Sequence, residues 1–139
     1  MRKTYADKDI AVTFDPRLCI HAARCVHGAP EAFDPQDRPW IRPANASADK
    51  LAAVIAECPT GALRYERLDG GPAEAVAAEV VIAFAKDGPI LVRGPMPLSD
   101  GAGNRYADAG ARYALCRCGG SGNKPFCDGT HRTMGFEDE

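Results

Sequence analysis

Residues 116–131 read CRCGGSGNKPFCDGTH, and this stretch organises the C-terminal half of the chain. Within sixteen positions it holds four potential metal ligands, Cys116, Cys118, Cys127 and His131. The glycines and the proline between them disfavour a long helix and favour a loop that wraps tightly around a small object. Three thiolates and one imidazole complete the ligand shell of a metal centre, so we expect such a centre here.

Two kinds of metal centre fit three cysteines and one histidine. Zinc binds such a set tetrahedrally. A 2Fe-2S cluster takes two ligands per iron, and histidine can replace cysteine on one of the irons. Zinc sites usually contain CxxC pairs, whereas the first pair here is CxC, which is unusual for zinc. The residues alone leave a structural zinc site open as the alternative.

The stretch resembles the CDGSH iron–sulfur family (mitoNEET-like), whose motif is CxC-x2-(S/T)-x3-P-x-CDG-(S/A/T)-H. Five further motif positions match in register: Ser121, Pro125, Asp128, Gly129 and Thr130. The threonine stands where the family's name has a serine, which is a tolerated variant. The resemblance implies a 2Fe-2S cluster whose ligands are Cys116, Cys118, Cys127 and His131. It extends over roughly residues 78–136, because a small β cap precedes the cluster loop in that family.

The N-terminal half shows strand and helix patterns around a second group of cysteines. Apolar residues alternate over 10–14, which predicts a half-buried strand. Pro30 can open a short helical turn, and residues 40–42 are a plausible short strand between two prolines. Ser47 can cap a helix with Leu51, Val54, Ile55 and Cys58 on one face, which Pro59 stops. Residues 63–66 predict a closing strand.

Cys19, Cys25 and the Cys58-Pro59 pair resemble the ligands of a mono-cluster bacterial ferredoxin. The bacterial motif is CxxCxxC with a remote CP. Divergent domains of this kind are similar to the sequence found here, CIHAARCVHGAPEAFD…RPWI…CPTGAL. The middle ligand position is Ala22, which cannot bind iron. The resemblance covers roughly residues 10–68, and scattered core cysteines are the alternative.

The alanine at position 22 leaves the type of the N-terminal cluster open. A 3Fe-4S cluster needs three thiolates, and three are present, whereas the family label implies 4Fe-4S and therefore a fourth ligand. His21 is adjacent and is the candidate for that ligand, while His27 is less well placed. For both histidines, a side chain that is exposed or hydrogen-bonded is a commoner outcome than one that binds iron. Counting ligands favours 3Fe-4S.

We place the domain boundary at the Gly/Pro-containing stretch Leu68–Pro72, after which the C-terminal half begins. Residues 80–84 alternate, a turn over 86–89 follows, and residues 90–92 return, which predicts a hairpin. Residues 113–115 form a short strand that leads into the cluster loop. We therefore predict an α+β protein: a ferredoxin-like domain of βαββαβ type over 1–69, a linker over 70–77, and a β-rich CDGSH-type domain over 78–139. Each half is small and should depend on its cluster for stability.

Composition and charge exclude several classes of function. The chain of 139 residues carries a net charge of −2 without a Lys/Arg cluster, which argues against nucleic-acid and anionic-membrane partners. The N-terminus shows no secretory signal, and no apolar run is long enough to span a membrane, so we expect a soluble, cytoplasmic protein. The six cysteines fall into two groups of three at ligand spacing, so we do not expect disulfides.

The sequence therefore predicts an iron–sulfur protein that is an electron carrier rather than an enzyme. No P-loop, GxGxxG motif or nucleophile–base set is present. Two clusters in one short chain suggest an electron relay between soluble redox proteins. The alternatives are storage or transfer of a cluster to an apo iron–sulfur acceptor, because histidine ligation makes the CDGSH-type site labile, and a redox or iron sensor. CDGSH proteins resemble one another in forming dimers, so we also consider a homodimer through residues 78–136.

Overall fold

The computed structural model describes residues 2–138 and divides them into two compact units. The first unit contains the chain up to Pro16, Ala22–Cys58 and Ala62–Ala75. The second contains Arg17–His21, Pro59–Gly61 and the chain from Val76 onward. Each unit has a three-stranded sheet together with at least one short helix, so the predicted α+β class is confirmed.

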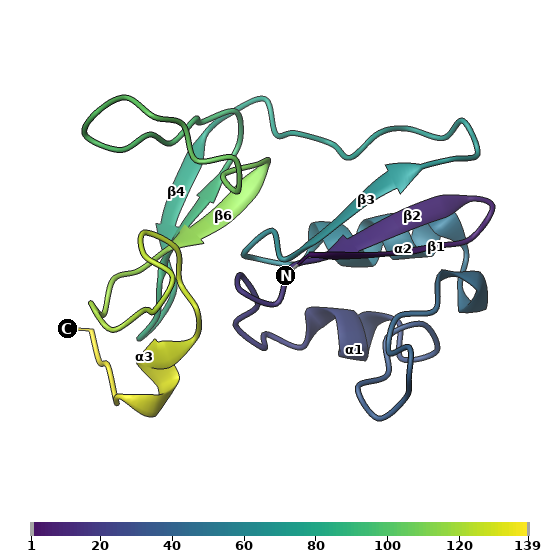
Figure 1. Ribbon diagram of the computed structural model, residues 1–139, viewed down its shortest axis with the longest axis horizontal. Helices are drawn as coiled ribbons and strands as arrows, with labels where there is room; N and C mark the ends of the chain where they lie inside the picture. Colours follow the sequence, from purple (N-terminus) through teal and green to yellow (C-terminus); the bar gives the residue numbers. More distant parts are fainter. Residues whose placement is uncertain (1, 139) are drawn as a thin grey trace. The chain divides into compact units, whose positions relative to one another are not determined.

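The first unit is built on an antiparallel sheet in the order β1-β2-β3 (Figure 1). Its strands are β1 (Lys3–Ala6), β2 (Ile10–Phe14) and β3 (Leu63–Arg67). Helix α1 (Arg24–Gly28), the 3-10 helix η1 (Pro43–Asn45) and helix α2 (Ala48–Ala56) come between β2 and β3 in the chain. The strands predicted over 10–14 and 63–66 are confirmed.

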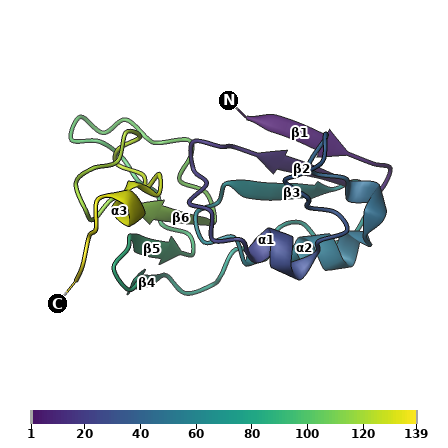
Figure 2. The same cartoon turned by 90° about the horizontal axis from the view of Figure 1, so that it is seen from below.

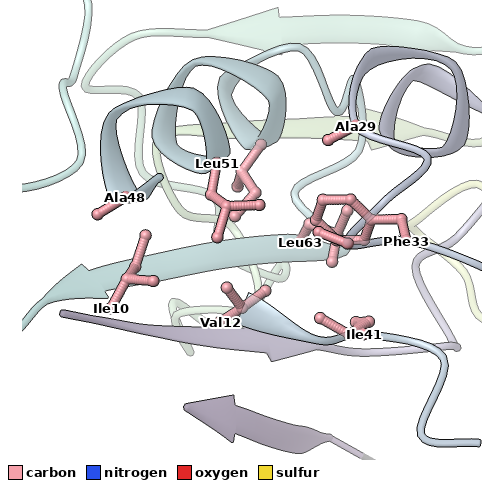
Figure 3. Packing of buried hydrophobic residues seen from close by; sticks show 10 residues of the cluster. Ile10, Val12, Ala29, Phe33, Ile41, Ala48, Leu51 and Leu63 are labelled. Atoms are coloured by element: carbon pink, nitrogen blue, oxygen red, sulfur yellow. The ribbon is translucent and has the colours of Figure 1, made fainter. Parts of the chain in front are cut away.

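Helix α2 packs its apolar stripe on this sheet, as its sequence predicted. The Ser47 side chain accepts a hydrogen bond from the Lys50 N–H, which satisfies one of the unpaired donors at the helix start. Leu51 and Ile55 are fully buried, and Figure 3 shows Leu51 pointing toward Ile10 and Val12 of β2. Two core residues from the sheet and two from the helix thus fix the position of α2, which ends two residues before Cys58.

The order of elements in the first unit differs from the βαββαβ type that we predicted. The chain runs β1-β2-α1-η1-α2-β3, and the middle strand expected over 40–42 is only a single bridge between Phe33 and Ile41. Pro39 and Pro43 bracket that segment and lack the N–H that a ladder needs, so pairing cannot extend. The sequence analysis also missed β1 and α1. The short helical turn expected at Pro30 is present, because the Phe33 N–H donates to the Ala29 carbonyl at 2.9 Å.

The second unit holds the sheet β4-β5-β6, whose strands lie side by side in Figure 2. The strands are β4 (Val81–Phe84), β5 (Ile90–Arg93) and β6 (Arg112–Leu115), and the short helix α3 (Thr130–Thr133) follows the cluster loop. The β4–β5 hairpin and the strand before Cys116 are both confirmed. None of the helices within residues 2–138 is long and apolar enough to cross a membrane.

Candidate metal centres

The loop over residues 116–127 is closed at its base by β6. The Cys116 N–H donates to the Pro125 carbonyl at 2.8 Å, and the Cys127 N–H donates to the Ala114 carbonyl at 2.9 Å. A bridge between Leu115 and Phe126 lies between these two bonds. The strand therefore fixes the first and third predicted cysteine ligands relative to each other, although eleven positions separate them in the sequence.

The four predicted ligands of this loop come together as two pairs. The Sγ atoms of Cys116 and Cys118 lie 3.9 Å apart, and Cys127 Sγ lies 3.4 Å from His131 Nδ1. Two donors on one tetrahedral metal ion lie roughly 3.3 to 3.8 Å apart when metal–donor bonds are about 2.0 to 2.3 Å, the longer value applying to two sulfur atoms. Each pair therefore has the spacing of two ligands on one metal ion. Within residues 2–138, no three His, Cys, Asp or Glu side chains converge on a single ion position.

Backbone N–H groups point at the three sulfur atoms of the loop. Gly119 donates to Cys116 Sγ at 3.3 Å, and Gly120 donates to Cys118 Sγ at 3.3 Å. The third such bond runs from the Gly129 N–H to Cys127 Sγ at 3.4 Å. Hydrogen bonds to sulfur stabilise thiolates and raise the reduction potential of iron–sulfur centres. The donors around the cysteines thus fit an iron–sulfur cluster.

The CDGTH turn places the histidine beside the third cysteine. Gly129 has φ 91°, a left-handed conformation that a residue with a Cβ rarely adopts, and α3 starts directly after it. The Asp128 carboxylate accepts bonds from the N–H and the hydroxyl of Thr130 and from the Gly122 N–H, so it ties the turn to the middle of the loop. The turn buries His131, whose exposed fraction is 8%, and its Nδ1 lies toward the Cys127 sulfur.

The protonation equilibria of these side chains differ in direction. Burial, and then the positive charge of Arg132, lower the pKa of His131, which favours the neutral imidazole that binds metals. Burial raises the pKa of the Cys127 thiol. At Cys116 burial opposes ionisation, but backbone N–H donors together with Cys118 and Lys124 outweigh it and lower the pKa. The loop thus favours a neutral histidine and one readily ionised thiol.

Two of the three N-terminal cysteines lie on neighbouring elements of the first unit. Cys25 is in α1 and Cys58 follows α2, and both pack against the same hydrophobic core. A Cβ on Gly28 would lie 3.0 Å from Val54 Cγ2, so the glycine lets α1 approach α2 closely. Beside the two cysteines, Arg24 and Glu57 form an ion pair at 3.9 Å. The helices therefore bring these predicted ligands to one region of the unit.

Cys19 lies in the segment Arg17–His21, which the structure groups with the second unit. The His21 N–H donates to Cys19 Sγ at 3.4 Å, and the exposed His21 ring has Nδ1 4.0 Å from the same sulfur. His21 and Ala23 both have positive φ, 58° and 61°, so the chain turns sharply around Ala22. The ring of His21 is thus beside a predicted ligand, whereas His27 lies at the end of α1.

Several contributors to the site were missed from the sequence. The glycine N–H donors follow CxC and CD directly, so the glycines were the signal that was available. Arg117, the residue between Cys116 and Cys118, carries no sequence signal, and its contacts are described below. All six cysteines lie in the described part of the chain, and none of them forms a disulfide there.

Comparisons with known proteins match both halves of the chain. Residues 5–68 match a family model described as a divergent 4Fe-4S mono-cluster, and residues 87–132 match a model described as an iron-binding zinc finger of CDGSH type. The chain is also 35% identical over 63 residues to the "Uncharacterized protein YjdI" of Escherichia coli (strain K12), a match that covers 45% of this chain and 83% of that protein. The protein of the same name from Escherichia coli O157:H7 gives the same figures.

Proposed function

The chain belongs to the divergent 4Fe-4S mono-cluster family and adds a CDGSH-type iron-binding domain to it, and on that premise we propose that it relays electrons between soluble redox proteins. Iron–sulfur clusters supply one-electron redox chemistry when bound. The domains fit a carrier that holds clusters rather than a catalyst that transforms a substrate. The residues of this chain would bind the clusters, tune them through hydrogen bonds to sulfur, and shield them from water.

The C-terminal cluster in this proposal is 2Fe-2S, with Cys116 and Cys118 on one iron and Cys127 and His131 on the other. The two donor pairs at 3.9 and 3.4 Å support this assignment over a single zinc ion, which would need all four donors around one point. The N-terminal cluster would bind Cys19, Cys25 and Cys58 and would be 3Fe-4S, or 4Fe-4S if His21 adds a fourth ligand.

The observation that carries the relay is that Cys19 belongs to the same compact unit as the CDGSH-type loop. Asn123 Nδ2 donates to the Arg17 carbonyl at 3.3 Å, and Arg132 Nη1 donates to the His21 carbonyl at 3.2 Å. The backbone of Gly129 also lies close to Ile20, since a Cβ added to Gly129 would be 3.6 Å from the Ile20 Cα. A ligand of one proposed cluster is thus one residue away from the ligand loop of the other, which supports electron exchange within the chain.

Cluster transfer to an apo iron–sulfur acceptor remains the second candidate, and one observation favours it. His131 borders a pocket of about 450 Å³ between residues 85–89 and 135–137. Such a pocket gives an acceptor ligand a way to reach the histidine side of the site. A sensor of redox state or iron is a third candidate function, and the metal analysis and redox cycling described for the relay would also test it.

A homodimer through the CDGSH-type domain is a further proposal. Strand β4 is at the edge of its sheet, all four of its residues are exposed, and Phe84 is 65% exposed. Unpaired apolar edge strands favour pairing with another chain. Sedimentation at micromolar concentration tests this, and a mass near 14.8 kDa, that of one chain, would exclude the dimer.

The experiment for the relay combines metal analysis with redox cycling of anaerobically purified protein. We expect about five or six irons per chain, which is two plus three or four, and zinc near zero. EPR spectra of the isolated and reduced protein should show two distinct centres that persist through repeated reduction and oxidation. A content of about two irons per chain would show that the N-terminal cluster is absent, and stoichiometric zinc would show the same for the C-terminal cluster. Rapid transfer of a cluster to an apo-acceptor would favour the transfer function over the relay.

A further inference from the structure

Arg117 lies between two proposed cluster ligands in the sequence, and its guanidinium contacts two aromatic rings. The guanidinium carbon is 5.4 Å from the centre of the Phe84 ring and 5.2 Å from that of Phe136. A guanidinium within about 6 Å of a ring centre is attracted to the ring face. One ring comes from the end of β4 and the other from the residues after α3, so the arginine joins segments far apart in the sequence.

The tip of the same side chain is hydrogen-bonded to the turn between β4 and β5. Arg117 Nε donates to the Gly88 carbonyl at 2.8 Å, and Nη2 donates to the Ala85 carbonyl at 2.9 Å. Nη2 also donates to Asp138 Oδ2 at 2.6 Å. The CxC backbone is therefore tied through one side chain both to the turn and to Asp138.

Asp138 makes further contacts with the same turn. Its carboxylate accepts bonds from Lys86 Nζ at 2.9 Å and from the Asp87 N–H at 2.9 Å, and its own N–H donates to Asp87 Oδ1 at 2.9 Å. Hydrogen bonds from Lys86, the Asp87 N–H and Arg117, in that order, hold the pKa of Asp138 well below its usual range. We call residues Phe136–Asp138 the tail and these Asp138 contacts the latch.

The turn and the tail are also two walls of the pocket that His131 borders. The latch thus joins the two walls that lie over the histidine side of the proposed site. The family match ends at residue 132, and Phe84, Phe136 and Asp138 all lie outside the matched range. The latch therefore involves residues that lie beyond the range matched by the family model.

We propose that the latch, with Arg117 as a positioning residue, sets the rate at which the CDGSH-type site loses its cluster. The inference rests on the proposed 2Fe-2S cluster at this site. With the latch closed, Arg117 holds the CxC loop still and the tail borders the approach to His131. Opening frees both. Loss to a chelator then replaces the four protein–iron bonds and the iron–sulfide bonds by chelator–iron bonds without a change of oxidation state. The two bridging sulfides leave as hydrogen sulfide after protonation, and the released thiolates take up protons.

The test uses the full chain with its clusters and compares Asp138→Asn and Arg117→Lys with the control Glu79→Gln. The control removes an exposed carboxylate from the same unit, outside both the tail and the pocket lining, and leaves the Asp138 contacts in place. Lysine keeps the charge of Arg117 but lacks the planar fork that bonds two carbonyls and contacts two rings. Two quantities are measured: hydrogen exchange of the Asp87 amide, which reports latch opening, and chelator-driven loss of the 2Fe-2S absorbance and EPR signal.

We expect Asp138→Asn and Arg117→Lys each to accelerate both quantities about threefold, the size expected for a solvent-screened ion pair. The rate of 2Fe-2S loss in Glu79→Gln and the N-terminal cluster signal in all variants should stay unchanged, and Asp138→Glu should recover most of the wild-type rate. Faster exchange at Asp87 with an unchanged rate of cluster loss would overturn the proposal, as would equal loss of both clusters, which would indicate general destabilisation. Wild-type protein without a 2Fe-2S signal would overturn the proposed function and the latch with it, whereas a normal wild-type signal with unaffected variants would overturn the latch alone.

Discussion

Replacing Leu51 by alanine should destabilise the first unit selectively and lower the temperature at which the N-terminal cluster is lost. Leu51 is fully buried at the centre of the core between α2 and the sheet (Figure 3). Fully buried Leu→Ala changes cost about 2 to 5 kcal/mol, because the cavity is only partly refilled. A domain of about 70 residues has a free energy of unfolding of roughly 4 to 10 kcal/mol. A loss of about 3 kcal/mol would lower the melting temperature by roughly 12 to 24 °C.

The assay follows both clusters of the full chain by EPR during thermal unfolding. Because α2 positions Cys58, the N-terminal signal should disappear at a lower temperature while the 2Fe-2S signal remains. The matched control is Leu68→Ala, since Leu68 is 49% exposed and its loss leaves no cavity. A Leu51→Ala protein that keeps the N-terminal signal to the wild-type temperature would refute the view that this core supports the cluster. Equal losses in both variants would refute it as well.

Three further predictions concern the ligands and the cap of α2. Ala22→Cys should convert a 3Fe-4S centre into a stable 4Fe-4S one, and an oxidised wild type without a 3Fe-4S EPR signal would argue against a vacant ligand site. Because the pKa of His131 is lowered in the folded protein, its stabilising effect is complete above the unfolded value of about 6.5 and is lost as pH falls below it. His131→Cys should therefore slow loss of the 2Fe-2S absorbance at pH 5.5, and equal decay rates would show that this histidine is not the labile ligand. Ser47→Ala should destabilise the first unit by about 1 kcal/mol in denaturant unfolding, because the Lys50 N–H loses its acceptor; an unchanged midpoint would contradict this.

Local patterns in the sequence predicted most of the elements. The alternation over residues 10–14, the serine cap of α2 and the turn between β4 and β5 each correspond to an observed element. These signals are reliable because periodicity and capping act over a few neighbouring residues. The loop ligands followed from their spacing and from a family resemblance, and the structure brings them together as two pairs.

The features that were missed depend on contacts between distant residues. Lys3–Ala6 is a strand because it pairs with β2, although its own residues are mostly exposed and give weak alternation. Helix α1 is five residues long and begins after a left-handed Ala23, which no propensity predicts. Nothing in the local sequence indicates that Asp138 returns to Arg117, because an ion pair across 21 positions is a product of the fold. Sequence reasoning therefore located the proposed metal sites but not the contacts that hold them in place.

The way the second unit is assembled from the chain has a consequence for protein synthesis. Arg17–His21 leaves the ribosome long before Asn123 and Arg132, whose side chains bond its carbonyls. The early segment therefore cannot form these contacts until the C-terminal residues have been synthesised, although domains generally fold as units in the order in which they are made. In the same way, a gene fragment that starts at Val76 would encode a second unit without two of its three pieces. Recombination that exchanged the C-terminal half of this protein would have to preserve the residues around Ile20 as well.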